Sequence, residues 1–294
     1  MPKDRASREL ARRRSSARRG AATPRKDQVE YAAEGEAQKP YTEILSEEIE
    51  AGVQEIERPA AGLLLSGLSA GLDVGFSLFL MGVMTTLVGD TLSHPVAEIL
   101  VANMYAVGFI FVVLGRSELF TEHTTLAVLP VLGGRASVAQ LLRLWGLIYL
   151  ANQVGAAIFA AIAAWVGPAL GVIQPWALGR IAHGLVDHSW WVMLASGVLA
   201  GWMMGLLSWL VTASRDTVSQ VFFVWLVTFS LGFAHLHHAV AGTVEVLAGA
   251  FSGQGITLAD FGRFLGIVTL GNMIGGVVFV AILKFAHATQ AATE

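Results

Sequence analysis

The chain has 294 residues, of which 54% are hydrophobic and only 14% are charged, and its mean hydropathy is +0.61. This composition is typical of a protein embedded in a membrane. Cysteine is absent, which excludes disulfides, thiolate metal sites and cysteine nucleophiles. The net charge of −3 says little about partners.

Residues 1–40 are polar and rich in arginine, and the arginines are not followed by the apolar run of a secretory signal. We expect a disordered basic cytoplasmic tail. Its arginines could contact anionic headgroups of membrane lipid, or they could be solvated and act only as a topology signal. The tail lacks interleaved aromatic residues, so we expect no nucleic-acid partner.

Residues 41–58 show a helical pattern. Leu45, Ile49, Val53 and Ile56 fall on one face, opposite acidic residues. This pattern predicts an amphipathic helix on the bilayer surface, with a soluble linker helix as the alternative.

Six apolar runs follow Pro59, and each is long enough for the roughly 20 residues of a membrane crossing. They cover residues 60–88, 96–132, 141–166, 190–212, 217–251 and 261–285. The second and fifth runs would exceed the bilayer thickness as straight helices, so we expect both to be broken. The distribution of basic residues puts both termini, including a tail at 287–294, in the cytoplasm.

An internal repeat links the two halves of the predicted channel domain, residues 59–286. Residues 66–75 match 196–205, and residues 152–159 match 272–279 at an offset of 272 − 152 = 120. The same offset aligns Glu118 with His238. Three crossings per half (59–166 and 190–286) give inverted repeats whose broken helices meet near the midplane. Small-residue stripes that arose independently are the alternative. His183 and His188 fall in the loop between the halves.

Polar residues interrupt the two over-long runs. In the first interruption, Thr121 offers a hydroxyl, Glu118 can bind loop amides, and Arg116 can pair with Glu118 or Glu122. The second contains His235, His237, His238 and, further on, Glu245. Ionisable groups at this depth are costly, so they usually face a cavity, a partner or a transport path, although helix packing could also satisfy the histidines.

Three of these segments, in order, resemble the formate/nitrite transporter family. They are Glu118-Leu119-Phe120-Thr121, His238-Ala239-Val240-Ala241 and residues 271–276, GNMIGG. The resemblance covers residues 42–286 and implies an all-α, aquaporin-like homopentamer in the bacterial inner membrane, each six-span protomer having its own pore for small monovalent anions. It also implies that Thr121, His238 and Asn272 are pore residues, with Leu119 and Phe120 near an apolar constriction.

The sequence departs from this family at three places. Gly201 and Gly242 stand where the family commonly has asparagine, and His235 and His237 look like an insertion before the pore histidine. The resemblance therefore implies a divergent branch, in which formate or nitrite need not be the cargo.

These observations favour a channel or transporter, not an enzyme, that uses no cofactor and carries a small anion or its conjugate weak acid. His238 would donate a hydrogen bond or a proton to the cargo. Two alternatives remain: a metal-binding protein using the three histidines with Glu245 or His123, and a scaffold or sensor that conducts nothing. The histidine spacing does not put all three rings on one helical face, so we expect no metal.

Overall fold

The computed structural model describes residues 38–89 and 91–291, so residues 1–37 of the predicted tail lie outside the described part. The described residues from Tyr41 onward form helices, with no strand among them. Five helical stretches are long and apolar enough to cross a membrane: Ala60–Val88, His94–Gly115, Val138–Ala169, Trp190–Ala213 and Leu258–Gln290. The predicted all-helical fold is confirmed.

The helices follow the predicted apolar runs. The first half contains α4 (Ala60–Asp73), α5 (Gly75–Val88), α6 (His94–Gly115), α7 (Phe120–Leu126), α8 (Val128–Leu132) and α9 (Val138–Ala169). The second contains α11 (Trp190–Ala213), α12 (Thr217–Phe233), α13 (Ala241–Phe251), α14 (Leu258–Gly276), the π-helical turn η1 (Val277–Ile282) and α15 (Leu283–Ala291). Residues 287–291, which we expected in a tail, therefore belong to α15.

The helices before two short connectors end in the same way. The first connector, residues 116–119, separates α6 from α7, and the second connector, residues 234–240, separates α12 from α13. Arg116 (φ 54°) and His235 (φ 51°) both have left-handed backbone conformations. Just after them, the Ser117 N–H donates to a carbonyl five residues back at 3.0 Å, and the Leu236 N–H does the same at 3.0 Å. Both helices thus end in a Schellman-type turn.

Two further helices flank this set. The N-terminal helix α3 (Tyr41–Glu57) buries Ile44, Leu45 and Ile56 and packs against α8 and α11. Its apolar stripe therefore contacts protein.

The second helix, α10 (Pro175–Val186), occupies the segment between the halves where we expected a loop. Proline at its first position favours a helix start, because that N–H needs no intrahelical partner.

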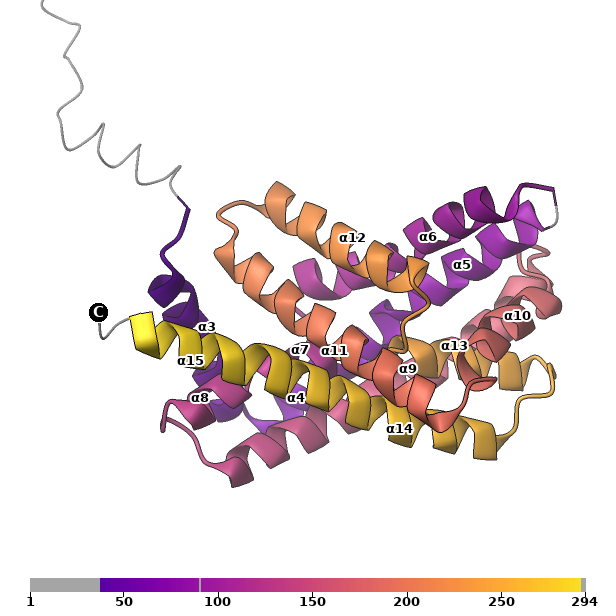
Figure 1. The fold of residues 1–294 in the computed structure, drawn as a ribbon. Helices are drawn as coiled ribbons and strands as arrows, with labels where there is room; N and C mark the ends of the chain where they lie inside the picture. Colours follow the sequence, from indigo (N-terminus) through magenta and orange to yellow (C-terminus); the bar gives the residue numbers. More distant parts are fainter. Residues whose placement is uncertain (1–37, 90, 292–294) are drawn as a thin grey trace, which may run out of the picture. The chain divides into compact units, whose positions relative to one another are not determined.

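The packing pairs helices that are distant in sequence. α4 packs against α9, α11 packs against α14, and α6 packs against α12. Figure 1 shows α11 alongside the rod of α14 and α15, with α12 next to α11. Small residues at these contacts let helix backbones approach closely, which is how helices associate in lipid. The ends of the two connectors, Leu119 and residues 237–240, are buried in this packing.

Candidate functional site

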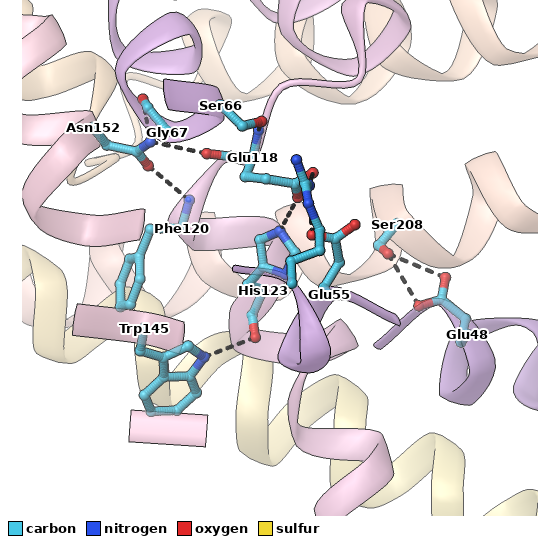
Figure 2. A network of polar contacts seen from close by, with 11 residues as sticks. Glu48, Glu55, Ser66, Gly67, Glu118, Phe120, His123, Trp145, Asn152 and Ser208 are labelled. Atoms are coloured by element: carbon cyan, nitrogen blue, oxygen red, sulfur yellow. Dashed lines mark hydrogen bonds and ion pairs between the residues drawn. The ribbon is translucent and has the colours of Figure 1, made fainter. Parts of the chain in front are cut away.

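The first connector is tied to the end of α3 by charged side chains (Figure 2). The Glu118 carboxylate pairs with Arg58 Nη1 at 2.7 Å and also contacts His123 Nε2. Arg58 Nη1 lies 2.7 Å from Glu55 Oε2 as well. The predicted partner of Glu118 was therefore wrong: Arg116 is exposed, and no ion pair found in residues 38–89 and 91–291 includes it.

The backbone of the first connector is held by Asn152 of α9. The Asn152 Nδ2 donates to the carbonyls of Gly67 (2.8 Å) and Glu118 (2.9 Å), and its Oδ1 accepts from the Phe120 N–H at 2.8 Å. The Ser66 hydroxyl accepts from the Glu118 N–H at 3.1 Å. Figure 2 shows Asn152 between Gly67 and Phe120. The bonds to Glu118 and Phe120 satisfy backbone groups that have no intrahelical partner, and the bond to Gly67 anchors Asn152 to α4.

Asn272 of α14 holds the second connector in the same way. Its Nδ2 donates to the carbonyls of Gly197 (2.8 Å) and His237 (3.0 Å), and its Oδ1 accepts from the Ala239 N–H at 2.8 Å. The Ser196 hydroxyl accepts from the His237 N–H at 3.0 Å. Asn272, predicted to be a pore residue, is fully buried and acts here as a bracket for the connector.

The matching bonds correct the predicted register of the two connectors. Glu118 and His237 occupy equivalent positions, at an offset of 237 − 118 = 119. Leu119, not Glu118, is therefore equivalent to His238. The asparagines are offset by 120 and the serines by 196 − 66 = 130, so the lengths between elements differ in the two halves. A single offset read from one element could not give the register of another.

The three histidines of the second connector have different surroundings. His235 is exposed and pairs with Glu98 Oε2 at 2.9 Å. His237 is buried; its Nδ1 lies 2.7 Å from the Ser196 hydroxyl and its Nε2 lies 3.0 Å from the Leu185 carbonyl. Of the three, only His238 contacts Thr121 at the start of α7. Within the described part of the chain, no group of three His, Cys, Asp or Glu residues is arranged to hold a metal.

The geometry around His238 assigns its ring tautomer. Nδ1 accepts from the N–H groups of Val240 (3.2 Å) and Ala241 (3.1 Å), so it carries no proton. The proton of the neutral ring is therefore on Nε2, which donates to Thr121 Oγ1 at 2.8 Å. Because Thr121 Oγ1 accepts this bond, its own hydroxyl proton can be donated elsewhere, and the described residues provide no acceptor for it. The Phe109 ring lies edge-on to His238, with centroids 5.2 Å apart.

The other predicted site residues lie around this contact. Leu119 is fully buried. The Phe120 ring packs against Tyr149 and Trp145 of α9, with centroids 4.9 and 5.9 Å apart. Glu122 is half-buried, and its Oε1 has no hydrogen-bond partner in the described part of the chain.

Sequence reasoning missed four residues that position the connectors: Arg58, His123, Ser66 and Ser196. The two serines open the repeated segments, and that shared position was the signal that could have identified them. Arg58 and His123 meet only through the packing of α3, and no pattern in the sequence indicates that contact.

The two glycines that depart from the family pattern are tightly packed. A Cβ on Gly201 would collide with the Asn272 carbonyl oxygen and lie 2.5 Å from Asn272 Cα. A Cβ on Gly242 would collide with the Phe264 ring. Asparagine has no room at either position in this backbone. Gly201 therefore allows close contact between α11 and α14.

Glu48 and His183 are among the titratable groups outside the apolar spans that have shifted pKa values. Burial raises the pKa of Glu48 on α3, although its carboxylate accepts from the hydroxyls of Thr212 (2.7 Å) and Ser208 (3.1 Å). The backbone carbonyl of Gln254, 3.0 Å from Nε2, raises the pKa of His183 on α10, and Asp187 acts in the same direction.

Comparisons with known proteins identify the family of this chain. The family model "Formate/nitrite transporter" matches residues 42–286. Inner membrane protein YfdC of Escherichia coli (strain K12) is 31% identical over 243 residues, covering 80% of this chain and 75% of that protein.

Two solved structures share the fold at 24% identity. An "FNT family ion channel" has a TM-score of 0.75, covering 84% of this chain and 99% of its own. A "Pentameric formate channel with formate bound" has a TM-score of 0.65, covering 78% and 98%. With matches across nearly all of its helical part, this chain belongs to the formate/nitrite transporter family.

Proposed function

We propose that the protein is a membrane channel or transporter for small monovalent anions or their conjugate weak acids. The observation that carries this proposal is the buried contact between His238 of the second connector and Thr121 of α7, just after the first connector. Equivalent asparagines hold the two connectors. Members of the family transport formate and nitrite, so the chain is a transporter and not an enzyme.

The architecture in this proposal is two inverted three-helix repeats. The broken second crossing consists of α6 and α7, and the broken fifth crossing consists of α12 and α13. The equivalent Schellman-type turns and asparagine brackets support this assignment. In this proposal, six crossings leave both termini on the same side of the membrane, and the distribution of basic residues indicates that this side is the cytoplasm.

We further propose a homopentamer in a bacterial inner membrane. The pentameric structural neighbour and the inner-membrane relative support this. Large apolar side chains along α9 are exposed, including Leu150 (63%) and Trp165 (67%). Such a surface requires lipid or another subunit.

The chemistry follows from the tautomer of His238. A small anion entering a narrow apolar passage loses its water and needs a hydrogen-bond donor. His238 holds the Thr121 hydroxyl as an acceptor, which leaves the Thr121 proton directed to the cargo. His238 therefore acts as a hydrogen-bond donor, because protonating Nδ1 would break its bonds with Val240 and Ala241.

The test is a solute panel on proteoliposomes at two pH values: formate, nitrite, acetate, lactate, hydrosulfide and neutral solutes. We expect protein-dependent flux of formate or nitrite that rises at the lower pH. Protein-free liposomes correct for leakage of the free acids. Flux of neutral solutes alone would contradict the proposal, and no flux of any solute would favour the non-conducting scaffold.

A further inference from the structure

A cavity of about 750 Å³ opens beside the second connector and is unused by the mechanism above. Its lining comes from α5, α6, α10, α13 and the second connector. At the mouth, Glu98 pairs with His235 (2.9 Å) and lies 3.5 Å from His94. Tyr105, Leu236 and Glu245 also line the cavity.

Glu245 is the unexplained group in this cavity. Its side chain is only 5% exposed, yet no hydrogen bond or ion pair to it is found among the described residues. Isolated buried carboxylates are costly, and such groups in membrane segments usually serve transport. A structural glutamate in a packed helix would have a partner, as Glu48 has in Thr212 and Ser208.

The position of Glu245 connects the cavity to the proposed passage. Tyr105 lines the cavity beside Glu245 and contacts Phe109, with ring centroids 5.1 Å apart. Phe109 in turn lies edge-on to His238. An aromatic pair thus separates the wet cavity from the buried His238, and an uncharged solute crosses such an apolar barrier far more easily than an anion does.

We propose that Glu245 is the proton donor of a weak-acid binding site in this cavity, an inference that rests on the proposed transport function. The protonated carboxyl donates a hydrogen bond to the oxygen of a small carboxylate such as formate. The O–H bond of Glu245 then breaks and an O–H bond forms on the anion. The neutral acid passes Tyr105 and Phe109, and the Glu245 carboxylate regains a proton from water in the cavity.

His238 is held as a neutral hydrogen-bond donor, so the transport mechanism needs a different proton donor. Glu245 supplies that proton. Other titratable or charged groups facing the cavity are His94, Glu98 and Tyr105 on α6, Arg180 on α10, His188 after it, and His235 on the second connector. Arg180 supplies positive charge that draws an anion into the cavity. Glu245 is the carboxyl that meets the anion at the buried end.

The experiment measures protons moved per formate. Proteoliposomes containing a pH-sensitive dye receive an inward gradient of radiolabelled formate, and valinomycin with potassium is added or omitted to clamp the voltage. In the original protein we expect about one proton per formate and a flux independent of valinomycin, as expected for passage of the neutral acid. The variants are Glu245→Gln, Glu245→Asp and, as a matched buried-carboxyl control, Glu48→Gln.

Glu245→Gln should lose protein-dependent acidification of the lumen, and its remaining formate flux should require valinomycin. Glu245→Asp keeps a carboxyl and should restore acidification, while Glu48→Gln should match the original protein. Size-exclusion chromatography checks assembly of every variant. A Glu245→Gln protein that still carries about one proton per formate overturns the inference but leaves the transport function standing. Absence of flux of every small anion in the solute panel in the original protein overturns both.

Discussion

At the scale of single residues, the contact that matters joins side chains 117 positions apart, Thr121 and His238. The sequence predicted both residues, since each stands in a segment that resembles the family. It could not predict the ring tautomer of His238, which depends on where the N–H groups of Val240 and Ala241 point. That detail decides whether the ring donates a proton or only a hydrogen bond.

The Thr121 hydroxyl can be tested with an isosteric pair. Thr121→Val removes the hydroxyl that meets His238, whereas Thr125→Val removes one that donates to the Gly276 carbonyl at 3.0 Å. Both threonines are buried on α7. Losing the cargo's hydrogen bond costs about 1.4 kcal/mol, so Thr121→Val should lower formate flux roughly tenfold. Equal flux losses in both variants would contradict a specific role for Thr121.

Gly201 provides a second test with an internal control. Gly266 on α14 has open space around a built Cβ, whereas a Cβ on Gly201 meets the Asn272 backbone. Alanine is favoured over glycine in helices by about 1 kcal/mol, so Gly266→Ala should raise the melting temperature. Gly201→Ala should lower it, because α11 must move away from α14. A stabilised Gly201→Ala protein would show that this contact is not close.

At the scale of elements, the apolar runs predicted the ends of the long helical stretches to within about three residues, except at the last end, 285 against Gln290. Lipid requires continuous backbone pairing, which is why these runs are helical. The sequence did not predict α10, whose helix is short and lies between the halves. It also missed the packing of α3 on the first connector, because Arg58, Glu118 and His123 meet only in the folded protein. The connector register was wrong by one residue because element spacings differ between the halves.

The asparagine brackets should carry much of the stability of the connectors. Asn272→Leu leaves the His237 carbonyl and the Ala239 N–H of the second connector buried without their Asn272 partner, and it removes a bond to the Gly197 carbonyl inside α11. Each such group costs about 1–3 kcal/mol, so thermal unfolding in detergent should shift strongly downward. Asn103→Leu on α6 is a half-buried control that bonds the Ile99 carbonyl of its own helix and the Trp225 Nε1–H, and it should shift unfolding less. Equal shifts would contradict the bracket role.

The contact between α10 and the turn before α14 should depend on pH. His183 has a raised pKa in the folded protein, since the Gln254 carbonyl and Asp187 favour its charged form. Its stabilising contribution is therefore complete below the ordinary histidine pKa and is lost as pH rises through the raised value. The melting-temperature gap between the original protein and His183→Gln should shrink from pH 5.5 to pH 8.5. A gap that grows with pH would contradict this sign.

At the scale of the whole molecule, the account depends on two halves that hold equivalent connectors against each other. Family membership and the all-helical fold could be predicted from the sequence, because three motifs appear in order within apolar runs. The cavity and its unpartnered Glu245 could not, since they depend on how α5, α6, α10 and α13 close around one space.

The central claim is that cargo passes the Thr121–His238 contact. The most direct measurement is the initial rate of formate uptake into proteoliposomes at two pH values, for the original protein and for His238→Phe. We predict that uptake by the original protein rises as pH falls, and that His238→Phe loses this protein-dependent uptake while still assembling normally. Uptake that is unchanged in rate and in pH dependence in His238→Phe would contradict the account.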